Sequence, residues 1–206
     1  MAKGKTFIIT GPSGVGKSTI LSALMEKRKN LYFSVSATTR DPRPGEEDGV
    51  HYHFINRDTF QEWIDRDEFL EHAEFVGNCY GTPKRFVDEA MDRGEDVILD
   101  IEVQGAMQIS AKRPEVIRVF IAPPSWEELE RRLTGRGTDS PEKIQKRLQR
   151  AREDADAARV YDYFIIIISY GGRNRFISTP VNSFTLLCTV INSFVFSSSD
   201  NCDIFL

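Results

Sequence analysis

Lys17 and Ser18 follow a glycine-rich turn and are residue types that can bind the phosphates of a nucleotide. The segment Gly11–Ser18 fits the pattern G-x-x-x-x-G-K-[S/T]. In such a turn, glycines let successive backbone N–H groups point at one anion, the lysine reaches the outer phosphates, and the hydroxyl ligates Mg²⁺. A chance match, with a turn that binds nothing, is the alternative. The β-branched run at 6–10 and the helical pattern after the turn favour a phosphate site.

A second candidate phosphate site lies in the segment that follows. Arg40 and Arg43 stand three residues apart and are accompanied by Pro42 and Pro44. Guanidinium groups bind phosphate through two parallel hydrogen bonds, and a rigid backbone reduces the entropy lost on binding. A charged surface loop without a ligand is the alternative that these residues alone leave open.

Two carboxylates, Asp100 and Glu102, end a nearly continuous apolar run that begins at Asp96. Such a run is typical of a buried parallel strand, whose carboxyl end is where open α/β sheets bind ligands. Carboxylates there can hold Mg²⁺ or accept hydrogen bonds from a nucleotide. Capping of the next helix is the alternative.

The elements that position these groups alternate between strand and helix patterns. This alternation predicts an α/β fold, a parallel sheet wrapped by helices of the P-loop NTPase type, with inserted segments. The expected strands are 6–10, 33–36, 96–102, 116–122 and, as the last core strand, 161–168, and a strand-and-turn stretch is expected at 71–82. The expected helices are 19–28, one or two short helices over 58–72 with Asp58 as N-cap, 84–93, 103–112, one capped by Ser125, and one beginning at Pro141.

Composition narrows the class of protein. The chain has 206 residues, a net charge of −4 and three cysteines without metal-ligand spacing. These values predict a globular cytoplasmic protein with no nucleic-acid or membrane partner, and the first strand starts too early for a signal peptide. The oligomeric state cannot be read from the sequence.

Several motifs together resemble the guanylate kinase family over residues 5–165. The resemblance rests on the segments Gly11–Ser18, Ser34–Glu46 with Tyr52, Phe69–Ala73 with Gly77–Thr82, Ile98–Gly105 and Leu133–Gly137. It implies transfer of the γ-phosphoryl group of ATP to GMP, with ATP and Mg²⁺ as cofactors and a place in purine nucleotide metabolism.

The resemblance also implies a role for each matching residue. It assigns catalysis to Lys17, Arg40, Arg43, Asp100, Arg132, Arg136 and Arg147, the last three as lid arginines over the triphosphate. It assigns ATP binding to Gly11, Pro12, Ser13, Gly14, Val15, Gly16, Lys17, Ser18 and Thr19, with Ser18 as the metal ligand. It assigns GMP binding to Ser36, Arg40, Arg43, Glu46, Tyr52, Glu71, Tyr80, Thr82, Asp100 and Glu102.

Within that set, Glu71 is expected to choose the base. A carboxylate can accept hydrogen bonds from guanine N1–H and from the 2-amino group together, whereas adenine offers neither donor. A site built on such hydrogen bonds can reject the wrong base by roughly 10⁴-fold.

The resemblance predicts a kinase domain at 4–168, with a GMP-binding insertion at about 34–83 and a lid at about 126–150. Residues 169–206 are expected to form an atypical, poorly ordered tail, in which only Arg173, Arg175, Asp200 and Asp203 are charged. Ser169 begins this tail where the family has an asparagine that contacts adenine. Cys79 stands where a second tyrosine is common, and we expect it to pack in the core.

Two other functions remain open from the residues. One is a catalytically weak or inactive guanylate-kinase-like module that binds a protein partner. The other is a kinase of a different small phosphorylated substrate on the same frame. The complete Gly16-Lys17-Ser18 motif argues against the first, and Glu71 argues against the second.

Overall fold

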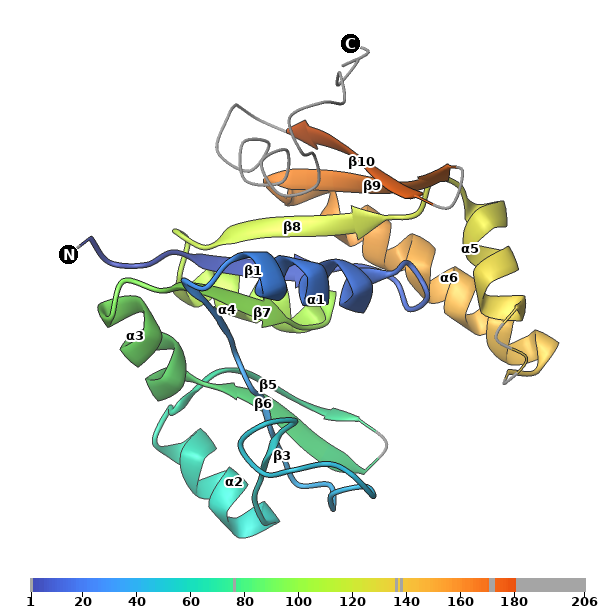
Figure 1. Ribbon diagram of the computed structural model, residues 1–206. Helices are drawn as coiled ribbons and strands as arrows, with labels where there is room; N and C mark the ends of the chain where they lie inside the picture. Colours follow the sequence, from blue (N-terminus) through green and yellow to red (C-terminus); the bar gives the residue numbers. More distant parts are fainter. Residues whose placement is uncertain (1, 76, 136, 138, 171–172, 181–206) are drawn as a thin grey trace.

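The computed structural model describes residues 2–75, 77–135, 137, 139–170 and 173–180, with side chains as far as residue 167. Figure 1 shows a core sheet with helices on both faces and a smaller sheet set below it. The strands of the core sheet are β1 (Thr6–Thr10), β2 (Leu31–Phe33), β7 (Asp96–Asp100), β8 (Ile117–Ala122), β9 (Tyr163–Tyr170) and β10 (Arg173–Pro180).

The core sheet has the strand order β10-β9-β8-β1-β7-β2, and all pairs except β9–β10 are parallel. Successive residues of β1 point to opposite faces, so Ile8 and Ile9 enter two different apolar clusters. This double burial explains why the strands read as unbroken apolar runs. The prediction of a parallel sheet wrapped by helices is confirmed.

The helices cover both faces of this sheet. Side chains of α1 pack on the Ile9 face, and side chains of α3 and α4 pack on the Ile8 face. The helices are α1 (Lys17–Lys27), α3 (Lys84–Asp92), α4 (Val103–Lys112), α5 (Trp126–Thr134) and α6 (Pro141–Ala157), followed by a 3₁₀ turn at Ala158–Val160. Ser125 and Ser140 cap α5 and α6, each accepting a backbone N–H three residues on.

The smaller sheet is formed by the inserted segment and has the order β4-β3-β6-β5. A cluster of Ala37, Phe60 and Phe69 fills the space between this sheet and α2, and Cys79 packs against it as predicted. Its elements are β3 (Ala37–Thr38), β4 (His53–Phe54), α2 (Arg57–Asp65), β5 (Phe69–Phe75) and β6 (Asn78–Pro83).

Two local predictions in this region are wrong. The one or two short helices expected over 58–72 are a single helix that ends at Asp65, because Asp67 adopts a left-handed conformation with φ of 51° and the chain continues as β5. Its N-cap is Asn56, whose side chain accepts the Thr59 N–H, and not Asp58. The strand expected at 33–36 is also displaced, since β2 ends at Phe33 and β3 begins at Ala37.

The end of the core sheet also differs from the expectation. The strand predicted to be the last, β9, is followed by β10. The two strands pair antiparallel, with Tyr163 opposite Pro180 at one end and Tyr170 opposite Arg173 at the other. The added strand occupies backbone donors and acceptors that an edge strand would leave unpaired. The rest of the tail, residues 181–206, lies outside the described residues, so its predicted disorder stays a prediction. Within the described part of the chain, no helix has the length and apolar character needed to cross a bilayer.

Candidate active site

The phosphate cradle joins the end of β1 to the start of α1. Gly16 stands at the N-cap of α1 with φ of 103°, a backbone angle that residues other than glycine rarely adopt. A Cβ on Gly11 would lie 2.5 Å from the carbonyl oxygen of Ile121, so only glycine lets the loop pass this close to β8. The side chain of Ser18, in the first turn of α1, is exposed to solvent. The loop therefore presents backbone N–H groups, a helix N-terminus and a free hydroxyl to one place.

Lys17 forms an ion pair with Asp100 in this structure. The Lys17 Nζ lies 2.6 Å from Asp100 Oδ1, and their side chains are 19% and 27% exposed. The pair exists because β1 and β7 are neighbours whose carboxyl ends meet at the same edge of the sheet. Glu102 is the N-cap residue of α4, but its side chain makes no capping hydrogen bond. The capping alternative for these two carboxylates therefore receives no support.

A third carboxylate near this edge was not predicted from the sequence. Asp154 lies on α6, its side chain is only 9% exposed, and Oδ1 is 3.2 Å from Arg150 Nε. Burial raises the pKa of Asp154. The charge of Glu102 raises this pKa further, and the charge of Lys17 lowers it. Asp154 is one of many charged residues on α6, and no local sequence pattern distinguishes it from the exposed ones.

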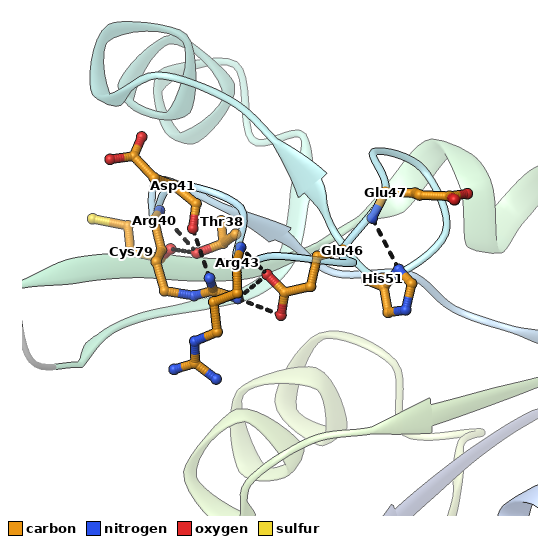
Figure 2. A network of polar contacts seen from close by, with 8 residues as sticks. All are labelled: Thr38, Arg40, Asp41, Arg43, Glu46, Glu47, His51 and Cys79. Atoms are coloured by element: carbon orange, nitrogen blue, oxygen red, sulfur yellow. Dashed lines mark hydrogen bonds and ion pairs between the residues drawn. The ribbon is translucent and has the colours of Figure 1, made fainter.

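The second candidate site lies on the smaller sheet and its loop. Glu46 accepts hydrogen bonds from Arg40 Nη2 on both carboxylate oxygens at 2.9 Å, and from the backbone N–H of Arg43 at 2.7 Å (Figure 2). Figure 2 shows the guanidinium of Arg43 pointing away from this network. The Arg40 side chain is 14% exposed, because Glu46 holds it against the loop.

Two tyrosines complete this cluster. The rings of Tyr52 and Tyr80 meet edge to face with centroids 6.1 Å apart, and the Arg40 guanidinium lies 5.5 Å from the centre of the Tyr52 ring. Burial raises the pKa of Tyr52, which keeps its hydroxyl protonated as a donor. Arg40, Tyr52 and Tyr80 thus lie close together, and all three carry hydrogen-bond donors of the kind that can bind phosphate.

Glu71 occupies a buried position on β5 directly opposite Thr82 on β6. It is 7% exposed, and Thr82 Oγ1 donates to its Oε1 at 2.7 Å. Burial raises the pKa of Glu71, while the hydrogen bond from Thr82 lowers it. Ser36 precedes β3 of the same sheet, where its carbonyl accepts the His53 N–H. A carboxylate held in this way is suited to accept hydrogen bonds from a neutral donor pair.

The predicted lid consists of α5 and α6, which pack together through Leu129, Leu133, Ile144, Leu148 and Ala151. Arg132 contacts the phosphate cradle, since its Nη1 donates to the carbonyl of Val15 at 2.9 Å, and its Nε donates to Glu128 at 2.7 Å. Arg147 pairs with Asp139 at 3.0 Å. Arg136 lies outside the described residues.

Glu128 accepts a hydrogen bond from Arg132, which contacts the phosphate cradle, and we expect Glu128 to stabilise the folded protein in a pH-dependent way. Hydrogen bonds from Arg131 and Arg132 lower its pKa from 4.5 to about 2. Because the folded pKa is the lower one, the stabilisation is present above about pH 4.5 and is lost as pH falls toward 2. We expect Glu128→Gln to lower the Tm by about 2 °C at pH 7 and by less at pH 3.

Thermal unfolding at pH 7, 4.5 and 3 measures this effect. The exposed Glu62→Gln, whose partner Arg66 lies 3.7 Å away, is the matched control and should have little effect at any pH. A gap between the parent and Glu128→Gln that stays constant across the range would contradict the assignment.

The fold and site define a class of protein. A glycine-rich cradle between the first strand and helix of a parallel sheet, with a lysine and a hydroxyl at its end, is the site of the P-loop nucleotide-binding proteins.

The comparisons with known proteins place the chain within that class. The sequence model of the guanylate kinase family matches residues 3–168. The chain is 52% identical to a guanylate kinase of Thermus thermophilus over 164 residues, covering 80% of this chain and 74% of that protein. It is 52% identical to a guanylate kinase of Trichormus variabilis over 165 residues, covering 80% and 83%. The chain belongs to the guanylate kinase family.

A solved structure agrees with this assignment. The crystal structure of guanylate kinase from Anaplasma phagocytophilum superposes with a TM-score of 0.62 at 34% identity, covering 80% of this chain and 77% of that one. The matched region of the family model ends at residue 168, where the sequence changes character.

Proposed function

We infer that this protein is an ATP:GMP phosphotransferase, which moves the γ-phosphoryl group of ATP to GMP and yields ADP and GDP. One observation carries the inference beyond family membership. The buried Glu71–Thr82 pair lies on the same small sheet as the Arg40, Tyr52 and Tyr80 cluster. A purine-selective carboxylate and a phosphate-binding cluster are thereby combined in one insertion.

We propose that ATP binds at Gly11–Thr19, with its phosphates on the backbone N–H groups and Lys17. Mg²⁺ fits this site, because Ser18 offers an exposed hydroxyl and Mg²⁺ is usually held by one or two protein groups together with substrate phosphates. Among the described residues, no group of three or more metal-binding side chains offers a separate cage. When bound, the ion would neutralise charge on the transferring phosphates.

We propose that the GMP phosphate is held by Arg40, Arg43, Tyr52 and Tyr80, and the base by Glu71 with Ser36 and Thr82. Asp100 and Glu102 face the ribose side from the core sheet. Glu46 has its carboxylate already occupied by Arg40 and the Arg43 N–H, so its role in GMP binding is to hold Arg40 in position.

The chemistry proposed is positioning with charge neutralisation. A GMP phosphate oxygen attacks the γ-phosphorus in line, the bond to the β–γ bridging oxygen breaks, and ADP leaves. Lys17 is expected to leave Asp100 for the ATP phosphates, which frees the carboxylate at the centre of the site. The lid arginines Arg132, Arg136 and Arg147 are proposed to close the site against water.

A substrate panel tests this function. The full chain is assayed for ADP release from ATP with GMP, dGMP, AMP and UMP as acceptors. We expect turnover with the two guanine nucleotides and at least about 10³-fold lower kcat/KM with the others. Equal rates with AMP would indicate another kinase on this frame, and no transfer to any acceptor would favour a binding module.

We place the enzyme in the cytoplasm because its three cysteines form no disulfide framework in the sequence.

A further inference from the structure

One face of α4 lies along the outer edge of β5, the strand that carries Glu71. The Gln108 side chain accepts the His72 N–H at 3.3 Å and donates to the His72 carbonyl at 3.2 Å. One turn further on, Lys112 Nζ donates to the carbonyl of Phe69 at 3.2 Å. Because β5 is the edge strand of the small sheet, these side chains take the place of a neighbouring strand. The position of β5 relative to the core is therefore set by α4.

Gly105 lies on the same face of α4, and the Glu71 carboxylate packs directly against it. A Cβ built on Gly105 would lie 2.8 Å from Glu71 Oε2 and 3.1 Å from its Cδ. A real Cβ does not approach an oxygen that closely. Any side chain at this position would force the carboxylate to move.

The backbone does not explain why glycine occurs here. Gly105 is in the first turn of α4 and has none of the positive φ values found at the turn glycines. Alanine is the better helix former at such a position, and Gly105 is buried. The space taken by the Glu71 carboxylate is the remaining reason for a glycine.

The two oxygens of Glu71 are thus fixed by different neighbours. Oε1 accepts the Thr82 hydroxyl at 2.7 Å, and Oε2 is accommodated only because Gly105 has no side chain. Glu71 is 7% exposed, so its carboxylate is packed among protein atoms on most sides. A shift of a few tenths of an ångström would misalign two hydrogen bonds to a planar base at once.

We propose that Gly105 is a specificity-determining residue, whose missing side chain sets the position of the Glu71 carboxylate and so the preference for guanine. The proposal rests on the proposed function, because it assigns Glu71 to the base. Gly105 acts through Glu71 and is a positioning residue, not a catalytic one.

The test is Gly105→Ala, assayed with GMP, AMP and inosine monophosphate, which lacks the 2-amino group of guanine. We expect the KM for GMP to rise about tenfold, with kcat changed less than about threefold. The preference for GMP over inosine monophosphate should fall, because the acceptor for the 2-amino group is displaced. Met107→Ala on the exposed side of the same helix is the matched control, and we expect it to leave all three values unchanged.

A second variant separates a displaced carboxylate from a general packing defect. Glu71→Asp shortens the side chain by one methylene and draws the carboxylate away from residue 105. In the double variant Glu71→Asp with Gly105→Ala, kcat/KM for GMP should exceed the value expected from multiplying the two single effects by at least about threefold. The Tm of Gly105→Ala, compared with that of the parent, reports separately on folding.

The outcomes are distinguishable from a failure of the proposed function. If the parent transfers phosphate to GMP but Gly105→Ala keeps the same KM and the same preference, the proposal is overturned. It is also overturned if the two single effects simply multiply in the double variant. If the parent shows no guanine preference, the assignment of Glu71 fails first and this proposal fails with it.

Discussion

Replacing Lys17 with alanine is expected to lower kcat for GMP phosphorylation by about 10²–10³-fold. Lys17 stands at the end of the cradle, where its ammonium contacts Asp100 at 2.6 Å. Its ammonium would stabilise charge on the transferring group, which alanine cannot do. A coupled assay of ADP release under saturating ATP and GMP measures the loss.

The fold should tolerate the change. Asp100 is 27% exposed, so water can solvate the carboxylate that Lys17 leaves behind. Lys3→Ala, which removes an exposed ion pair with Asp92, is the matched control and should retain the parent rate. Equal rates for Lys17→Ala and the parent would rule out phosphate transfer at this cradle.

Glu71→Gln is expected to lower kcat/KM for GMP by about 10³-fold. An amide of the same shape offers one acceptor and one donor, so one of the two guanine donors meets an N–H group and the hydrogen bond is replaced by repulsion. Glu74→Gln on the same strand, an exposed residue 3.7 Å from Arg57, is the matched control and should behave as the parent. A variant that kept the parent's preference for GMP over AMP would remove Glu71 from base recognition.

The same substitution should not destabilise the protein at neutral pH. Burial raises the pKa of Glu71 above 4.5, so the ionised carboxylate costs stability as pH rises from 4.5 through the folded pKa. Glutamine removes this cost and can keep the hydrogen bond from Thr82. Thermal unfolding between pH 4 and 8 should show a Tm for Glu71→Gln that equals or exceeds that of the parent at the upper end. Loss of activity together with a lowered Tm would instead indicate a structural role.

Local sequence signals were sufficient for the elements whose boundaries depend on a few neighbouring residues. The helix at Val103–Lys112 and the caps Ser125 and Ser140 follow from periodicity and capping chemistry within one turn. The helical prediction over residues 66–72 was wrong because Asp67 turns the chain and β5 pairs with β6. Pairing with a strand that comes later in the chain overrides a local helical preference.

The phosphate cradle could likewise be recognised in the sequence, because it needs two glycines five positions apart, a lysine and a hydroxyl within eight positions. Which groups meet was decided only in the tertiary structure. Lys17 reaches Asp100 because the sheet order places β1 beside β7, and Arg132 reaches Val15 across 117 positions. Gly105 meets Glu71 because α4 covers the edge of β5. Contacts of this kind depend on strand order and helix placement, which no short window of sequence contains.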